Sequence, residues 1–143
     1  MGFSHATQGF TLLLLSASLL AVGAARTIVI GGSENWGLGL DYTVWAHQNR
    51  PFYINDTLVF KYDPPSENST GFSVYLLPDL RSYAKCDFSR AKLLANTTQG
   101  SGEGFAYVLN KWRPYYFASG EDNGTQCYPG MMKFFAAPAP PRH

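Results

Sequence analysis

The stretch "PFYINDTLVFKYD", residues 51–63, decides the fold class of this chain of 143 residues. Leu58, Phe60 and Tyr62 recur at every second position, between residues that face the other way. A period of two residues is the pattern of a β-strand, because successive side chains of a strand point to opposite faces of a sheet. The polar, Pro-containing loop "DPPSENSTG", residues 63–71, follows and ends the run. We predict a strand over this run.

Six more extended segments lie along the chain. They are "RTIVIGG" (26–32), "DYTVWA" (41–46), "FSVYLL" (72–77), "GEGFAYVLN" (102–110), "PYYFAS" (114–119) and "MMKFFAA" (131–137). Turn-forming residues separate these segments from one another. About seven short strands with turns between them predict an all-β fold, an antiparallel β-sandwich.

One segment departs from this pattern. In "CDFSRAKLLANTTQG", residues 86–100, the apolar residues Phe88, Ala91 and Leu94 fall on one face of a helix. Asp87, just ahead of them, is a residue type that caps helix N-termini. We predict one short helical segment here, of one or two turns.

The first 25 residues have the layout of a secretory signal peptide. The apolar run "TLLLLSASLLAV", residues 11–22, is too short to span a bilayer and is followed by the small residues "GAA". We expect cleavage near Ala24 or Ala25. The chain then divides into a signal peptide (1–25), one domain (26–137) and a Pro-rich C-terminal tail (138–143).

The charges exclude one class of partner. The chain has 11 Lys and Arg residues against 10 Asp and Glu residues, without a basic run, which argues against nucleic-acid binding. No second apolar segment reaches membrane-spanning length, and the tail lacks the hydrophobic stretch of a glycolipid-anchor signal. We expect a secreted, extracellular protein without a transmembrane segment. Association with the plasma membrane would require another isoform that carries an anchor signal.

The cysteines and the Asn-x-Ser/Thr triplets agree with export. The chain has two cysteines, Cys86 and Cys127, and in an oxidising compartment such a pair is most simply a disulfide. Four triplets are acceptors for N-linked glycans, and none has Pro in the middle position. Their asparagines are Asn55, Asn68, Asn96 and Asn123. We therefore expect a glycoprotein with one disulfide bond.

Several segments together resemble the phytocyanins, the secreted plant cupredoxins that include the early nodulin-like proteins. These segments are "TIVIGGSENW", "DYTVWA", "FYINDTLVFKYDPP", "SVYLLPDLRSYAKCD", "YYF" and "CYPGMMKFF". The similarity covers about residues 26–137, and its most specific part is a Tyr-x-x-Cys motif ahead of a Cys-x-x-Gly-Met motif. The resemblance implies a cupredoxin-like Greek-key β-sandwich.

The resemblance also implies where a metal would lie. Copper-binding phytocyanins hold one type 1 copper with two His, one Cys and a weak axial Met or Gln. Phe72, Ser119 and Gln126 occupy the positions of the first His, the Cys and the second His, and Met131 stands at the axial position. A blue-copper site depends on its trigonal His-Cys-His set, and the axial ligand is long and weak. We therefore expect no copper cofactor, and Met131 as a packed side chain.

No enzyme site stands out in the sequence. His47 lies in a polar link, and nothing in the sequence brings it together with Ser119 and Asp122 as a Ser-His-Asp arrangement requires. Asp and Glu are scattered along the chain, and no carboxylate pair suggests glycosidase chemistry. In a small sandwich a tryptophan is more often a core residue than a sugar platform. The three tryptophans are Trp36, Trp45 and Trp112.

The resemblance to the early nodulin-like proteins implies a non-redox binding or structural role at the plant cell wall or cell surface. The partner would be an extracellular protein or a cell-wall carbohydrate, and we expect the protein itself to be a monomer. The alternative is blue-copper electron transfer, the function of the copper-binding members. A glycan at Asn123 would stand over the end of the sandwich at which those members exchange electrons.

Overall fold

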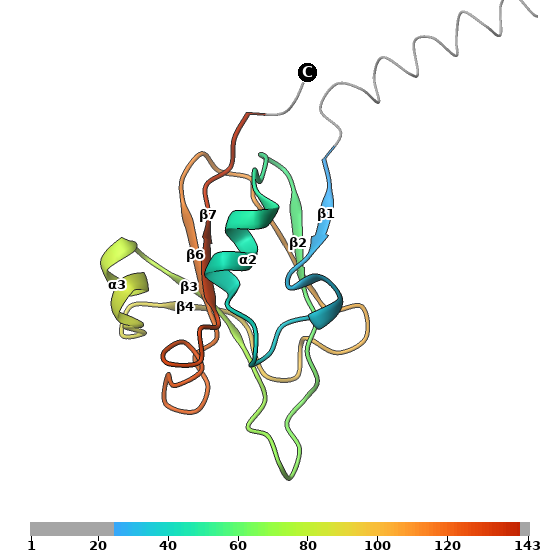
Figure 1. Ribbon diagram of the computed structural model, residues 1–143, viewed down its shortest axis with the longest axis vertical. Coiled ribbons are helices and arrows are strands. Elements are labelled where there is room, and N and C mark those ends of the chain that lie inside the picture. Colours follow the sequence, from blue (N-terminus) through green and yellow to red (C-terminus); the bar gives the residue numbers. More distant parts are fainter. Residues whose placement is uncertain (1–24, 141–143) are drawn as a thin grey trace, which may run out of the picture.

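A computed structural model describes residues 25–140, so the expected signal peptide lies almost wholly outside the described residues. Within this range seven strands form two sheets that face each other (Figure 1). The first sheet has the order β1-β2-β5, with β1 (Thr27–Val29), β2 (Thr57–Phe60) and β5 (Phe105–Val108). The second has the order β4-β3-β6-β7, with β4 (Lys92–Ala95), β3 (Val74–Leu77), β6 (Tyr115–Ala118) and β7 (Lys133–Ala136). The predicted all-β sandwich is confirmed.

The strand pairing differs from the expectation in one place. β1 runs parallel to β2, with Thr27 opposite Thr57 and Val29 opposite Val59. The other four pairings, β2 with β5, β3 with β4, β3 with β6 and β6 with β7, are antiparallel as expected. Two parallel strands need a long crossover connection, and here the connection between β1 and β2 includes a short 3-10 helix η1 (Gly32–Glu34) and a longer α-helix.

That α-helix, α2 (Tyr42–Asn49), occupies the segment "DYTVWA", so the expected strand there is wrong. The carboxylate of Asp41 accepts a hydrogen bond of 3.2 Å from the Val44 N–H and caps the helix. Tyr42 and Ala46 are both buried, and their spacing of four residues fits one face of a helix as well as alternate positions of a strand. In its helical form the segment packs this face against β7.

The second α-helix, α3 (Leu80–Lys85), precedes the segment expected to be helical. Asp79 is its N-cap and accepts a hydrogen bond from the Ser82 N–H at 2.8 Å, while Cys86 ends it in a left-handed conformation (φ +52°). The predicted helical segment over residues 86–100 is therefore wrong. Its centre forms β4, which pairs with the edge of β3 opposite to β6. Pairing with a neighbouring strand therefore outweighs the local helical pattern.

The core between the sheets consists mainly of aromatic rings. Trp36, Phe60, Phe117 and Phe134 are at most 2% exposed, and neighbouring rings lie 5.1 to 5.5 Å apart in the pairs Trp36–Phe60, Phe60–Phe117 and Phe117–Phe134. Such edge-to-face and tilted contacts add stability beyond the burial of apolar area. By contrast, Trp112 is 64% exposed.

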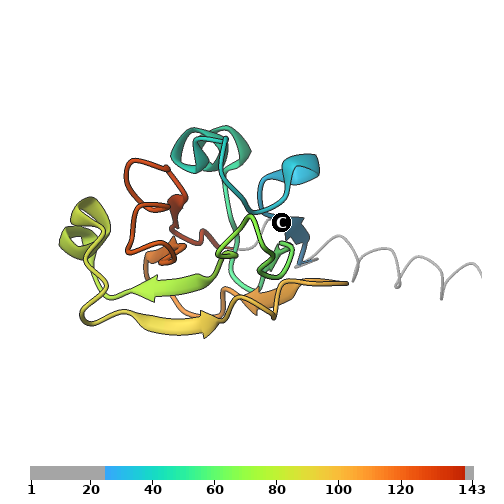
Figure 2. The same cartoon turned by 90° about the horizontal axis from the view of Figure 1, so that it is seen from below.

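A smaller cluster lies under α3, at the side of the molecule away from β1 (Figure 2). It contains Leu77, Tyr83, Ala118 and Cys127. Cys127 is bonded to Cys86, as predicted, and the two Cα atoms lie 6.0 Å apart. The disulfide fixes the end of α3 to the loop between β6 and β7. Residues 25–140 contain no helix with the length and apolar character needed to cross a bilayer.

Candidate functional site

The four positions expected from the ligand pattern lie at one end of the sandwich. Phe72 precedes β3, Ser119 follows β6, and Gln126 and Met131 belong to the loop that leads into β7. The structure brings two of these side chains into direct contact. The Ser119 hydroxyl donates a hydrogen bond of 2.6 Å to Oε1 of Gln126. Ser119 is fully buried and Gln126 is 4% exposed, so this bond lies inside the protein.

The remaining polar atoms of this pair are also bonded to protein. Nε2 of Gln126 donates to the Gly71 carbonyl at 2.9 Å, and the Ser119 hydroxyl accepts from the Ser73 N–H at 3.0 Å. Oγ of Ser73 accepts in turn from the Gly120 N–H at 3.1 Å. Within the described residues no buried side-chain nitrogen or oxygen lacks a hydrogen-bond partner. We call this set, Gly71, Ser73, Ser119, Gly120 and Gln126, the Ser–Gln cluster.

The cluster joins three separate segments of the chain. Gly71 and Ser73 belong to the approach to β3, Ser119 and Gly120 to the end of β6, and Gln126 to the loop before β7. Sequence reasoning did not identify the contributions of Gly71 and Ser73. Gly71 contributes only a backbone carbonyl, for which a sequence carries no signal. A serine directly before a buried strand is a weak signal for a buried hydroxyl.

Phe72 contributes an apolar ring and no donor atom. It is partly buried, its ring lies edge-on to Tyr62 with the centroids 6.5 Å apart, and it packs beside Gly37. Burial raises the pKa of Tyr62 to about 12, with a smaller contribution from the charge of Glu121. The Tyr62 phenol therefore stays neutral and donates a hydrogen bond of 2.7 Å to the Asn96 carbonyl. This side of the site is a packed aromatic wall.

Met131 does not behave as expected. Its side chain is 45% exposed and its φ is +63°, so the prediction that it packs is wrong. Met132, the next residue, is fully buried in the main core. Its N–H donates to the Gln126 carbonyl at 2.9 Å, and its carbonyl accepts from the Ser119 N–H at 3.1 Å. The backbone of Met132 therefore borders the Ser–Gln cluster, while its side chain packs in the main core.

The loop between β6 and β7 is held by its own hydrogen bonds. Asp122 and Asn123 both adopt left-handed conformations, with φ +56° and +54°, and the Thr125 hydroxyl donates to the Asp122 carboxylate at 2.9 Å. The disulfide at Cys127 anchors the loop to α3. Asn123 is exposed at its tip, and the asparagines of the other three triplets are exposed as well. The fold leaves each acceptor side chain accessible to solvent.

The donor set of the Ser–Gln cluster does not fit a type 1 copper ion. It offers a neutral hydroxyl, a neutral amide and backbone carbonyls, where the metal requires a thiolate and two imidazole nitrogens. The hydroxyl and the amide already bond to each other. Among the described residues no group of three or more His, Cys, Asp or Glu side chains is placed to hold a metal ion. His47 lies elsewhere, exposed on α2, and Ser119 is bonded to Gln126 and Ser73 instead.

The chain is similar to known blue copper proteins in fold. It superposes on cucumber stellacyanin with a TM-score of 0.62 and 19% identity, over 81% of this chain and 96% of that one. Cucumber basic protein, a blue copper protein, gives a TM-score of 0.59 with 22% identity, over 79% and 99% of the two chains. At this level of identity the likeness concerns the cupredoxin-like fold alone.

Sequence comparison identifies relatives in two plants. Early nodulin-like protein 4 of Arabidopsis thaliana is 30% identical over 136 residues, which cover 92% of this chain and 55% of the relative. Blue copper protein 1b of Medicago truncatula is 38% identical over 60 residues, 39% of this chain and 36% of the relative. The chain thus spans about a third to a half of the length of these relatives. Residues 35–131 match the Plastocyanin-like domain family. The chain belongs to the phytocyanins, within the plastocyanin-like domain family.

Proposed function

We propose that this protein is a secreted, N-glycosylated phytocyanin without a type 1 copper site, and that it has a non-redox binding or structural role at the plant cell wall or cell surface. The observation that carries the proposal is the buried hydrogen bond of 2.6 Å between Ser119 and Gln126. These two residues stand where the copper-binding members have their thiolate and second imidazole. A hydrogen-bonded cluster has taken the place of a metal centre.

Electron transfer requires a redox-active group, and the residues at this end of the sandwich provide none. Type 1 copper chemistry depends on a covalent Cu–thiolate bond, which a serine hydroxyl cannot supply. Phytocyanins and early nodulin-like proteins are in general non-enzymatic electron carriers or binding proteins. Without the metal, binding is the function that this fold retains.

Two features support a location outside the cell. The disulfide between Cys86 and Cys127 is typical of proteins that fold in an oxidising compartment. The asparagines of the four N-glycosylation triplets, Asn55, Asn68, Asn96 and Asn123, are all exposed. Glycans on these residues would leave the core undisturbed.

The metal part of the proposal is tested by rebuilding the ligand set. The triple variant Phe72→His, Ser119→Cys, Gln126→His restores the two imidazoles and the thiolate on the same fold. We expect this variant to turn blue with added copper, and the double variant that keeps Ser119 to stay colourless. Mass spectrometry of the Cys86–Cys127 bond verifies that the new thiol has not exchanged with the disulfide. A folded triple variant with the native disulfide that stays colourless would contradict the assignment of these positions.

Two further substitutions in the blue triple variant identify the axial thioether. Met131 stands at the axial position of the ligand pattern and is 45% exposed, whereas the Met132 side chain is buried in the main core. Met131→Leu should therefore shift the copper absorption band, and Met132→Leu should leave it unchanged. The opposite result would assign the axial position to Met132.

The binding part of the proposal is tested with the glycosylated protein purified from a plant secretory host. Immobilised protein is exposed to fractionated cell-wall polysaccharides and to extracellular proteins, with a copper-binding phytocyanin as the matched control. Selective retention of one fraction by the copper-free protein supports the proposal. Retention equal to that of the control, for every fraction, counts against a specialised binding role.

A further inference from the structure

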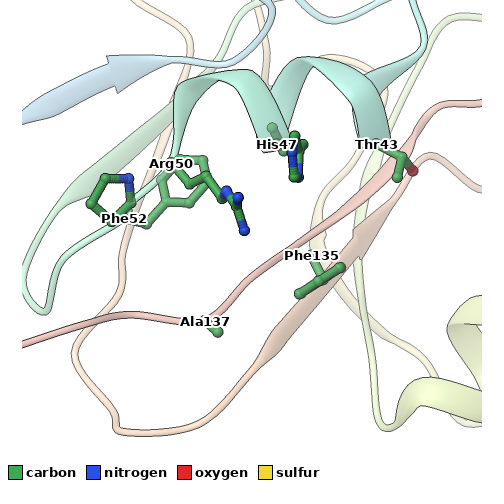
Figure 3. Close-up of a pocket in the computed structure, with 8 residues that line it drawn as sticks. Thr43, His47, Arg50, Phe52, Phe135 and Ala137 are labelled. Carbon is green, nitrogen blue, oxygen red and sulfur yellow. The ribbon is translucent and has the colours of Figure 1, made fainter.

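A pocket separate from the Ser–Gln cluster lies between α2 and β7, toward the end of the molecule where the described chain begins and ends (Figures 1 and 3). Its volume is about 330 Å³. Small-molecule sites in proteins are concave, start near this volume and combine apolar walls with a few polar groups. This pocket has both components.

The walls are apolar and come from two sides. Phe52 is 3% exposed and Ala46 is 5% exposed, and both contribute to the side formed by α2 and the segment after it. Phe135 and Ala137 form the facing side, and the Phe135 ring remains 49% exposed (Figure 3). The exposed Phe135 ring offers a flat ligand an apolar surface, and the remaining apolar residues of the lining complete the wall.

Hydrogen bonds outside the pocket hold these walls in place. The Ala139 N–H donates to the Phe52 carbonyl at 2.8 Å and ties the segment after β7 to the segment after α2. The Arg26 guanidinium donates to the Pro51 carbonyl at 2.7 Å and pairs with the buried carboxylate of Asp56 at 2.9 Å. The pocket is therefore preformed, and a ligand would not have to order the chain on binding.

Two basic side chains project into the same space. The His47 ring comes from α2 and the Arg50 guanidinium from just beyond its end, and Figure 3 shows both directed toward the gap in front of Phe135. Within residues 25–140 the ion pairs are Arg26–Asp56 and Arg90–Asp79, so neither His47 nor Arg50 has an acidic partner there. The pocket thus has hydrogen-bond donors, one of them a permanent cation, without an acceptor from the described protein.

We propose that this pocket binds a small carboxylic acid with a flat apolar body, such as an arylacetic acid. The guanidinium of Arg50 presents two parallel N–H donors that match the two oxygens of a carboxylate. The Phe135 ring and the other apolar lining residues would contact the apolar body. A hydrated inorganic anion would leave these walls without a contact, and a neutral aromatic molecule would leave Arg50 without one. The proposal does not depend on whether copper is absent from the other end of the sandwich.

The test is an NMR titration of the purified full mature protein with phenylacetate, phenylacetamide and inorganic phosphate. We expect saturable shifts for the amides of residues 43–50, 52 and 135–137 with phenylacetate. Phenylacetamide and phosphate should bind at least about tenfold more weakly, because each lacks one of the two recognition elements. Equal binding of phenylacetate and phenylacetamide, or the absence of saturable shifts around the pocket, overturns the proposal.

Variants separate a specific site from general attraction to a basic surface. Arg50→Gln should weaken phenylacetate binding roughly tenfold or more. The matched control Arg81→Gln removes an exposed arginine on α3 and should leave the affinity unchanged. Ala137→Leu keeps all charges but fills the pocket, and it should abolish binding. If Arg50→Gln and Arg81→Gln behave alike, or Ala137→Leu binds normally, the pocket is not the site.

Discussion

At the scale of single residues, Ser119 and Gln126 form a matched pair. The serine hydroxyl can donate one hydrogen bond and accept others, and the glutamine amide has an acceptor and two donors. The Ser119 hydroxyl donates to Oε1 of Gln126 and accepts from the Ser73 N–H. Nε2 of Gln126 donates to the Gly71 carbonyl. The pair is therefore satisfied without water or metal. A buried polar cluster of this kind is stabilising only while every member keeps its partner.

This arrangement predicts the effect of removing the hydroxyl. Ser119→Ala leaves Oε1 of Gln126 and the Ser73 N–H buried without partners, and we expect the free energy of unfolding to fall by about 1–3 kcal/mol. Urea denaturation measures the loss. The control Ser101→Ala changes an exposed serine in a turn and should alter the stability by less than about 0.5 kcal/mol. Equal stability of Ser119→Ala and the parent protein would show that the cluster is not a structural element.

Comparing the sequence with the copper-ligand pattern identifies Ser119 and Gln126, but it does not predict the hydrogen bond between them. The two residues are seven positions apart, and their hydrogen bond exists only because the intervening loop folds back through left-handed residues such as Asp122 and Asn123. The different environments of two consecutive methionines have the same cause. The turn at Met131, with φ +63°, exposes its side chain and directs that of Met132 into the core. The residue spacing of a motif does not predict such a turn.

At the scale of elements, strands were easier to predict than helices. The run at β2 alternates clearly, and its flanking turns are polar, so local pattern and tertiary structure agree. The segments at α2 and β4 carry patterns that fit two structures. For α2 the cap at Asp41 decides in favour of a helix, and for β4 pairing with β3 decides in favour of a strand. The second decision depends on a partner distant in sequence, which explains why local reasoning failed there.

The cap of α3 makes a prediction about acid stability. The Ser82 N–H and the Arg90 guanidinium hydrogen-bond to Asp79 and lower the pKa of its carboxyl from 3.8 to about 2. A lowered folded-state pKa contributes stability above pH 3.8 that is lost as the pH falls toward about 2. Asp79→Asn should therefore be less stable than the parent above pH 4, and the difference should shrink in acid.

Urea denaturation at several pH values measures this difference. The control Asp63→Asn removes an exposed carboxylate that caps no helix, and it corrects for the general loss of negative charge. A difference between Asp79→Asn and the parent that stays constant from neutral pH to about 2 would contradict the role of the Asp79 charge.

At the scale of the whole molecule, the disulfide joins the two sides of the smaller cluster. Cys86 and Cys127 are 41 residues apart in the sequence. Closing a loop of this length restricts the unfolded chain and stabilises the fold by about 4 kcal/mol in the chain-entropy model. Cys86→Ser with Cys127→Ser should lower the free energy of unfolding by up to this amount, measured by urea denaturation. A double variant as stable as the parent would mean that the bond has no such role.

Processing gives a second prediction for the whole molecule. The backbone N–H of Arg26 donates to the buried carboxylate of Asp56 at 3.0 Å, and the Arg26 guanidinium pairs with the same carboxylate. A chain that begins at Arg26 keeps both contacts. Intact mass spectrometry of the secreted protein should find an N-terminus near Arg26 and a mass that falls on deglycosylation. Retention of residues 1–20, or the absence of glycan at all four asparagines, would contradict secretion by this route.

The central claim is that a hydrogen-bonded cluster replaces the copper centre of a phytocyanin. The most direct test is the metal content and visible absorption of the natural protein, purified from its source without chelators and then incubated with cupric ions. We predict much less than one copper per chain and no blue thiolate-to-copper band, because Ser119 offers no thiolate and Cys127 is held in the disulfide. One tightly bound copper per chain would contradict the claim, and an intense blue colour would show that a thiolate binds the metal.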